Sequence, residues 1–323
     1  MSTRTAVDVG GTWLRIRVGD SAVLRHPAPS RIHHPHREPD ELVASLVTTL
    51  AEHAPPDSTV DVSCGAALDE ELGIAYGSGP LWGGELPTRL PLRTLLEQAR
   101  PDVTWNLVND VTAALADAVR QLARPTDRRV AYLTVSSGIA LRTADLTASV
   151  IDVDTYGLQG EVGHLRAATS APEAVRSLEC LCGGTGHIAA LCAGPAIPRV
   201  AAALGLPEPA AVAAQLSARV AADDPDARTL LRTIVEPIAE LVRTLRTTDP
   251  LLDLVVLGGG VAEGLAEVYE TELTAQLAEV RSYADAGPAE LRVRVCRPGH
   301  IDPLAGATAV AIGRLPVRKG RFR

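Results

Sequence analysis

The feature that most limits the fold of this chain is a strand–turn–strand pattern that occurs twice. The first copy joins the strand-like runs Thr5–Val9 and Leu14–Val18 through Gly10-Gly11-Thr12. The second copy occupies residues 130–143 and turns at Gly138. Short β-branched runs separated by glycine are typical of β-hairpins. Helical and strand-like segments follow each copy, so the sequence predicts two α/β domains that face each other across a cleft.

The composition supports a folded chain of this size. The 323 residues are 46% hydrophobic and carry a formal net charge of −8, which is ordinary for a globular protein and argues against a surface that neutralises nucleic-acid phosphates. No run approaches the roughly 18 consecutive apolar residues of a membrane helix, and no signal-type stretch follows Met1. We therefore expect a cytoplasmic protein that binds neither nucleic acid nor membranes.

The first candidate site is the turn Asp8-Val-Gly-Gly-Thr12. Two glycines let backbone N–H groups approach a phosphate because no Cβ blocks the way. Thr12 adds a hydroxyl donor, and the carboxylate of Asp8 can hold Mg²⁺ or one of its waters. The same residues also suit an ordinary tight hairpin.

Two further segments carry polar or glycine residues at the ends of predicted strands. Asn109-Asp110 lies between the strand-like run Val103–Val108 and the predicted helix Asp110–Leu122. A carboxylate there can accept a proton from a substrate hydroxyl, although helix capping alone would explain the pair. Gly258-Gly259-Gly260 follows the apolar run Leu252–Leu257 and precedes a helix expected from about Leu265. It suits either a bound nucleoside or a simple strand-to-helix turn.

The most specific cluster contains two His and two Cys. His164 ends the segment Glu161-Val-Gly-His, and Cys180, Cys182 and His187 follow within a glycine-rich stretch. Four such ligands complete a tetrahedral Zn²⁺ site and leave no position for water, so we expect a structural zinc.

Taken together and in this order, these features resemble the ROK family of sugar kinases, repressors and open reading frames, along nearly the whole chain. The resemblance implies a two-domain, actin-like, hexokinase-type (ribonuclease H-like) α/β fold with an interdomain cleft. It places residues 1–112 and a closing helix in 303–323 in the N-terminal domain, and residues 113–302 with the zinc loop in the larger C-terminal domain. It also implies a homodimer.

The same resemblance assigns roles to individual residues. Asp110 is the expected catalytic base, and Asn109, Glu161 and His164 lie on the substrate side. ATP, with Mg²⁺, is expected on Asp8, Gly10, Gly11, Thr12, Ser137, Gly138, Gly259 and Gly260. Structural Zn²⁺ is expected on His164, Cys180, Cys182 and His187.

The chain departs from the family pattern mainly on the acceptor side. Ala189 stands where the family has a sugar-contacting Glu, Ala66-Ala67 replaces Pro-Gly, and Gly79–Trp82 replaces Pro-Asn-Leu-Pro. His187 stands in place of a third zinc-loop Cys, and the second phosphate loop reads Ser136–Ala140 instead of Gly-Thr-Gly-x-Gly. Because a site built to pair a polar group discriminates against mismatched analogues, we expect an acceptor other than plain glucose.

Our main hypothesis is transfer of the ATP γ-phosphate to the primary (6-) hydroxyl of a glucose-like hexose, including a modified one such as the amino sugar kanosamine. Two alternatives stay open. One is a kinase of a seven-carbon cyclitol in secondary metabolism. The other is a non-catalytic sugar-binding sensor, which the altered second phosphate loop suggests. A repressor is disfavoured, because the phosphate loop begins at Asp8 and leaves no room before it for a DNA-binding domain.

Overall fold

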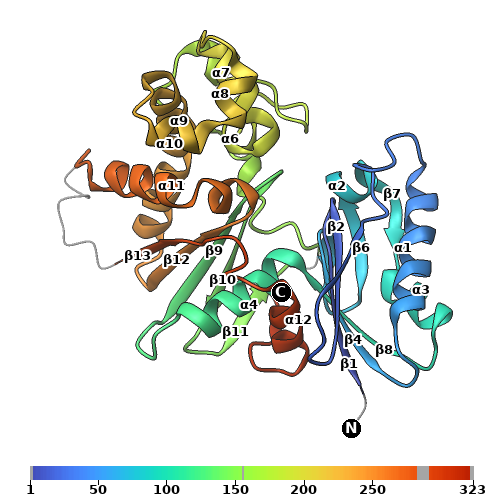
Figure 1. Cartoon of the computed structure of the whole chain (residues 1–323). Helices are drawn as coiled ribbons and strands as arrows, with labels where there is room; N and C mark the ends of the chain where they lie inside the picture. Colours follow the sequence, from blue (N-terminus) through green and yellow to red (C-terminus); the bar gives the residue numbers. More distant parts are fainter. Residues whose placement is uncertain (1–2, 155, 282–290, 321–323) are drawn as a thin grey trace. The chain divides into compact units, whose positions relative to one another are not determined.

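A computed structural model describes residues 3–154, 156–281 and 291–320 of the chain. It has the mixed α/β class expected from the sequence and divides into two compact units (Figure 1). The first unit comprises Met1–Leu122, Arg142–Gln159 and Asp302–Arg323, and the second comprises Ala123–Leu141 and Gly160–Ile301. Each unit is described by itself below.

The first unit is built on a five-stranded sheet with the strand order β3-β2-β1-β4-β8. β1, β4 and β8 run parallel to one another, and β2 is antiparallel to both β1 and β3. These strands are β1 (Arg4–Val9), β2 (Trp13–Val18), β3 (Leu24–Pro27), β4 (Thr59–Cys64) and β8 (Thr104–Asn109).

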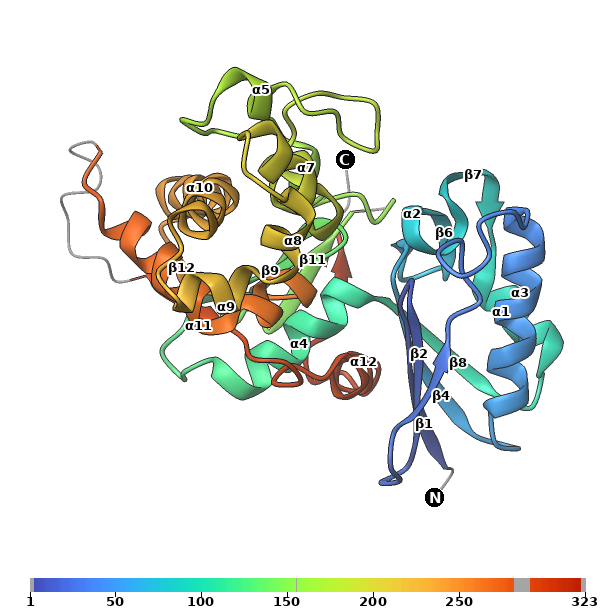
Figure 2. The ribbon, with the colours of Figure 1, turned by 45° about the horizontal axis from the view of Figure 1, so that its top comes forward.

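Helices cover both faces of this sheet (Figures 1 and 2). α1 (Pro39–His53) and α3 (Leu92–Ala99) pack on one face, and α4 (Asp110–Leu122) and α12 (Pro303–Ala311) lie on the other. Successive side chains of a strand point to opposite faces, so Val7 and Val9 of β1 share a core with Leu42 and Leu46 of α1. Asp8, between these valines, is directed to the other face.

Smaller elements complete the first unit. Three antiparallel strands, β5 (Ala67–Asp69), β6 (Ile74–Ser78) and β7 (Gly84–Leu90), form a second sheet, with the short helix α2 (Gly79–Trp82) between β6 and β7. This sheet was not predicted, because its strands are short and rich in glycine and polar residues. The last two residues of β10 (Ile139–Asp145) pair with β11 (Val150–Val153), which pairs in parallel with β14 (Val317–Lys319).

The second unit has a parallel sheet in which β12 (Leu252–Gly258) lies between β9 (Arg129–Val135) and β13 (Arg292–Val295). Its core consists almost entirely of Ala, Val, Leu and Ile, with the buried Tyr269 as an exception. Its helices and 3₁₀ turns are η1 (Val162–His164), α5 (Glu173–Arg176), α6 (Ile188–Cys192), η2 (Gly194–Ala196), α7 (Ile197–Ala203), α8 (Pro209–Ala214), α9 (Leu216–Ala221), α10 (Pro225–Thr248) and α11 (Gly260–Ala278).

The start of α11 corrects one expectation. The helical segment already begins at Gly260, so the glycine run itself forms the strand-to-helix junction. The backbone is non-helical at Ala266, where two helices meet across a kink, so the second of them starts close to the expected Leu265. The Glu263 side chain accepts a hydrogen bond from the Gly259 backbone N–H at 2.9 Å, which supplies a partner for one of the N–H groups that a helix start leaves unpaired. Within the described residues, no helix has both the length and the apolar character needed to cross a membrane.

Candidate active site

The carboxyl ends of three parallel strands meet at one edge of the first unit's sheet. Val9 pairs with Cys64, and Cys64 pairs with Asn109, so β1, β4 and β8 end in register. The residues that follow each strand therefore lie close together. A Cβ atom on Gly65 would stand 3.3 Å from Oδ2 of Asp110 and 3.3 Å from the carbonyl oxygen of Val9. This places the half-buried carboxylate of Asp110 at the strand edge beside the first glycine turn.

Asp8 lies at the same edge and is nearly fully buried, with 5% of its surface exposed. Its Oδ2 accepts hydrogen bonds from Arg15 Nε at 3.0 Å and Nη2 at 2.7 Å. Its Oδ1 accepts a hydrogen bond from the Ser63 hydroxyl at 2.8 Å. A carboxylate has about four lone-pair sites, so Asp8 retains capacity for one water of a hydrated Mg²⁺, which usually keeps several of its waters in proteins.

The carboxylates of Asp110 and Asp8 both lie near the buried thiol of Cys64. Burial raises the pKa of Cys64, and the nearby negative charges of Asp110 and Asp8 raise it further. Both carboxylates therefore act on the same short stretch of backbone. Arg15 offsets part of this negative charge through its ion pair with Asp8, and the carboxylates are groups that can hold the waters of a hydrated Mg²⁺.

Asn109 is occupied by contacts within the fold. Its Oδ1 accepts hydrogen bonds from the backbone N–H groups of Val111 at 3.0 Å and Thr112 at 3.3 Å, as a helix cap does. Its Nδ2 donates to the carbonyl oxygen of Ala66 at 3.0 Å. The capping interpretation raised from the sequence thus describes this side chain, which holds the β8–α4 junction. A contact between Asn109 and a substrate stays a prediction.

In the first glycine turn, the Gly10 N–H donates to the Trp13 carbonyl oxygen at 3.0 Å, whereas the N–H groups of Gly11 and Thr12 are open among the described residues. The Gly11 carbonyl oxygen accepts from the Ser30 hydroxyl, and the Thr12 carbonyl oxygen contacts Nε2 of His33 at 2.8 Å. Within the described part of the chain, the backbone N–H groups of Gly11 and Thr12 have no hydrogen-bond partner. Successive open N–H groups form an anion-binding concavity, so this geometry suits a phosphate.

A second glycine-rich group forms in the other unit, at the carboxyl ends of β9 and β12. The exposed Ser137 and Gly138 lie in the β9–β10 turn, and Gly259 and Gly260 lie at the β12–α11 junction. These two segments lie against each other, because a Cβ built on Gly259 would stand 2.8 Å from the carbonyl oxygen of Val135, and one built on Gly260 would stand 3.5 Å from Oγ of Ser136. Backbone without side chains at such a strand edge suits a nucleotide.

Glu161 directly precedes the 3₁₀ turn η1 and His164 is its last residue, and both side chains are exposed. Gly163 sets the position of this turn, because a Cβ at residue 163 would stand 2.6 Å from the carbonyl oxygen of Ile139. Only glycine lets the turn pack this closely against the first residue of β10. The glycine of the Glu-x-Gly-His segment thus has a packing reason.

The predicted zinc ligands lie together in the second unit. The ligand atoms of His164, Cys180, Cys182 and His187 all lie within 4.8 Å of one another. Nδ1 of His164 is 3.8 Å from the Cys180 sulfur, and Nδ1 of His187 is 3.2 Å from the Cys182 sulfur. Metal–ligand bonds of about 2.0–2.3 Å place tetrahedral Zn²⁺ ligands roughly 3.3–3.8 Å apart, so these residues fit a zinc ion.

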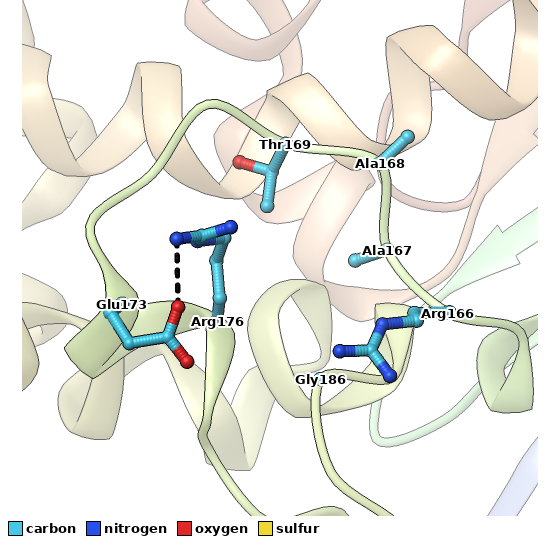
Figure 3. Close-up of a pocket in the computed structure, with 7 residues that line it drawn as sticks. All are labelled: Arg166, Ala167, Ala168, Thr169, Glu173, Arg176 and Gly186. Atoms are coloured by element: carbon cyan, nitrogen blue, oxygen red, sulfur yellow. Dashed lines mark ion pairs between the residues drawn. The ribbon is translucent and has the colours of Figure 1, made fainter.

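A cavity of about 210 Å³ lies beside this cluster (Figure 3). It is lined by Arg166, Ala167, Ala168, Thr169, Glu173, Arg176 and Gly186. Arg176 forms an ion pair with Glu173 at 2.7 Å, drawn as the dashed line in Figure 3. None of the site residues predicted from the sequence lines this cavity.

The predicted residues thus fall into two groups, one in each unit. Asp8, Asn109, Asp110 and the first glycine turn share one sheet edge in the first unit. The second unit holds Glu161, the second glycine-rich group and the Cys/His cluster. Sequence reasoning missed the partners Arg15, Ser63 and Ser30, because a lone Arg or Ser carries no motif.

Comparison with known proteins identifies the family. A model described as the ROK family matches residues 4–314. A 2-epi-5-epi-valiolone 7-kinase from Actinoplanes sp. is 39% identical over an alignment of 346 residues, which covers 99% of this chain and 96% of that protein. A C(7)-cyclitol 7-kinase from Streptomyces hygroscopicus subsp. jinggangensis is 29% identical and covers 84% of this chain and 83% of its own length.

The fold is similar to that of a solved ROK hexokinase from Thermus thermophilus, with a TM-score of 0.68, 25% identity and coverage of 94% of this chain and 96% of that one. The two-domain actin-like fold predicted from the sequence is therefore confirmed. The predicted enzyme class, a phosphotransferase with an alcohol group as acceptor, is confirmed by the kinase relatives. This chain belongs to the ROK family.

Proposed function

We propose that this kinase transfers the γ-phosphate of ATP to the primary hydroxyl of a seven-carbon cyclitol. The observation that supports this acceptor is the 39% identity, over 99% of the chain, to a 2-epi-5-epi-valiolone 7-kinase. The cyclitol, which was an alternative in the sequence analysis, thereby replaces the glucose-like hexose as the main hypothesis. The acceptor is a small molecule, and the homodimer that the family resemblance implies stays a prediction.

The departures on the acceptor side agree with this choice. Ala189 cannot pair with a substrate hydroxyl, whereas the Glu expected there from the family resemblance can. A cyclitol has a carbocyclic ring and so lacks the hemiacetal hydroxyl that a glucose kinase can recognise. Because an unpaired polar group in a site costs binding energy, a site without this carboxylate suits an acceptor without the matching hydroxyl.

In the proposed reaction, Asp110 accepts the proton of the primary hydroxyl as its oxygen attacks the γ-phosphorus. A positioned base of this kind contributes roughly 10²–10⁴-fold to the rate. The transition state of phosphoryl transfer is loose, so positioning of the acceptor and neutralisation of charge contribute most of the remainder. Glu161 would orient the acceptor through its hydroxyls, and Asn109 would hold Asp110 at the start of α4.

The phosphates of ATP would bind the open N–H groups of Gly11 and Thr12, and Asp8 would hold a water of Mg²⁺. The nucleoside would lie on Ser137, Gly138, Gly259 and Gly260. Mg²⁺ supplies charge neutralisation to the phosphates when it is bound. A structural Zn²⁺ on His164, Cys180, Cys182 and His187 would fix the turn that carries Glu161.

An acceptor panel tests the proposal. Purified protein is incubated with Mg·ATP and 2-epi-5-epi-valiolone, glucose or kanosamine, and turnover is read by ADP release and by the mass of the product. We expect phosphorylation of the cyclitol with a kcat/KM about 10²-fold above that for glucose. Asp110→Asn should lower kcat by roughly 10²–10⁴-fold, whereas Asp57→Asn, at the exposed amino end of β4, should have no effect.

Each other outcome selects a different hypothesis. A preference for glucose or kanosamine would support the hypothesis that the acceptor is a hexose. Binding of the cyclitol without turnover by the wild-type protein would favour the non-catalytic sensor.

A further inference from the structure

A buried carboxylate with no assigned role lies next to the proposed catalytic residues. Glu70 directly follows β5 in the first unit and is only 7% exposed. Its Oε1 accepts a hydrogen bond from the backbone N–H of Asn109 at 2.8 Å. Its Oε2 is buried and has no hydrogen-bond partner within the part of the chain that the structure describes. This side chain therefore contacts the last residue of β8, immediately before Asp110.

The position of β8 explains why a side chain is needed at this point. β8 is an edge strand of its sheet, so its outward N–H groups have no neighbouring strand to bind. A buried N–H without an acceptor costs about 1–3 kcal/mol. Glu70 supplies that acceptor at Asn109, while the Asn109 side chain caps α4 and binds the Ala66 carbonyl oxygen. Both the backbone N–H and the side chain of Asn109 therefore make hydrogen bonds that hold the β8–α4 junction.

Charged and polar neighbours make a buried carboxylate tolerable at this place. Burial raises the pKa of Glu70, while the Asn109 N–H, the nearby Thr112 hydroxyl and the positive charge of Arg142 oppose that rise. Arg142 is itself buried, with 3% of its surface exposed. Since burying a charge is costly unless an opposite charge lies near, the positive charge of Arg142 offsets part of the cost of burying the Glu70 carboxylate.

Arg142 connects this pair to a second segment of the first unit. Its guanidinium donates to the carbonyl oxygens of Gly157 and Gln159. Gly157 also packs directly on β5, because a Cβ there would stand 2.3 Å from the backbone nitrogen of Leu68. The segment that ends two residues before Glu161 in the chain is therefore fixed to the same strand that carries Glu70.

We propose that Glu70 is a positioning residue for the phosphoryl transfer: it fixes the β8–α4 junction, and through it the carboxylate of Asp110. The proposal rests on the proposed function. A shift of a reacting group by about 1 Å can lower the rate by 10²-fold, so loss of the Glu70 contact should reduce kcat more than it affects the binding of ATP.

Three variants test this role. Glu70→Ala removes the acceptor, Glu70→Gln keeps a carbonyl oxygen for the Asn109 N–H but removes the charge, and Glu71→Ala is the matched control, because Glu71 is exposed. With Mg·ATP and 2-epi-5-epi-valiolone, we expect Glu70→Ala to lower kcat by about 10- to 100-fold with an unchanged KM for ATP. Glu70→Gln should stay within about threefold of wild type, since the acceptor that positions Asn109 is retained.

Two further measurements separate positioning from stability. All kinetics are recorded well below the unfolding midpoint of each variant. Amide hydrogen exchange, which requires no substrate, should accelerate at residues 109–112 in Glu70→Ala but not in Glu71→Ala.

A Glu70→Ala enzyme with wild-type kcat would overturn the proposal while leaving the proposed function intact. Equal loss of kcat in Glu70→Gln and Glu70→Ala would also overturn it, because the retained carbonyl would then give no rescue. A wild-type enzyme without turnover on any acceptor would instead remove the proposed function, and the positioning role with it.

Discussion

The absence of a side chain at Gly306 allows α12 and α4 of the first unit to pack closely. A Cβ on Gly306 of α12 would lie 1.8 Å from the carbonyl oxygen of Ala113 in α4. No rotamer relieves this clash, because a Cβ is fixed by the backbone. The close approach also brings Ala307 into a small cluster with Ala113 and Val108, directly beside the start of the helix that carries Asp110.

We therefore expect Gly306→Ala to destabilise the protein by about 3 kcal/mol, because two backbones must separate. Gly264→Ala is the control: Gly264 is exposed within α11, and nothing lies within 4 Å of a Cβ there. That substitution should stabilise by about 0.5–1 kcal/mol. Urea unfolding of the two variants measures both effects. Equal stability of Gly306→Ala and wild type would show that the helices can move apart without cost.

At the scale of residues, the sequence could single out those candidate residues that lie at strand ends. Asp8 and Asp110 are recognisable because each is polar and adjoins a short apolar run. Their partners are not, since Ser63 lies 55 positions from Asp8 and Glu70 lies 39 positions from Asn109. A contact over such a distance depends on the strand order of the sheet, which no local pattern contains.

At the scale of elements, an ion pair joins β9 and β12 of the second unit at their amino ends. Arg128, just before β9, donates from its backbone N–H at 2.6 Å and from Nε at 3.1 Å to Oδ2 of Asp253 in β12. Its Nη2 donates to Oδ1 of the same carboxylate at 2.8 Å. These contacts join the two central strands at the end opposite to the glycine-rich group.

The pair predicts a defined pH dependence. The side-chain hydrogen bond from Arg128 holds the pKa of Asp253 below its ordinary value of 3.8. A lowered pKa in the folded state means that the stabilisation is complete above that ordinary value and is lost as pH falls through the folded pKa. Asp253→Asn should therefore cost about 1 kcal/mol at pH 7, after screening by solvent at the half-exposed Arg128.

The difference in unfolding free energy between wild type and Asp253→Asn should shrink as the pH is lowered below about 4. Urea unfolding at several pH values measures it, with Asp20→Asn in the exposed β2–β3 turn as the control. A difference that grows in acid would contradict the assignment, because it would require a raised pKa in the folded protein.

Elements with a clear period were predicted well, and irregular ones were not. The helix Asp110–Leu122 has the bounds expected from its apolar pattern, and the strand expected at Leu252–Leu257 extends by one residue to Gly258. The sheet of β5, β6 and β7 was not predicted, because these strands pair with one another in irregular registers. The conformation of such a strand depends on the neighbouring strands more than on its own side chains. Its sequence therefore shows only a weak alternation of apolar and polar residues.

At the scale of the whole molecule, the repeated strand–turn–strand pattern predicted two α/β bodies. The first unit also includes residues 142–159 and 302–323. Their place depends on contacts such as the ion pair from Lys319 Nζ to Oδ2 of Asp69 at 2.7 Å and the close packing of Gly157 on β5, where a Cβ would stand 2.3 Å from the backbone nitrogen of Leu68. The family resemblance placed a closing helix in 303–323 in this unit, but it did not place residues 142–159 there. The contacts of residues 142–159 with β5 exist only in the folded unit, so the sequence pattern alone does not predict them.

The zinc cluster leads to a prediction about the two units separately. All four ligands belong to the second unit, and binding of a structural zinc contributes directly to folding. We expect one zinc per chain by elemental analysis. His187→Ala should lose the metal, whereas His187→Cys should keep it, because zinc accepts a Cys₃His set. His34→Ala, an exposed histidine outside the cluster, should leave the metal content unchanged.

Removal of zinc should act on one unit and on one substrate. Amide hydrogen exchange should accelerate at residues 161–188 after chelation and stay unchanged in the sheet of the first unit, since β1, β4 and β8 make no contribution to the cluster. The KM for the cyclitol should rise severalfold, because Glu161 begins the turn that ends at His164, while the KM for ATP should not change. Full zinc content in His187→Ala would contradict the four-ligand assignment. Equal losses of protection in both units would mean that the metal supports the fold as a whole rather than the turn that presents Glu161.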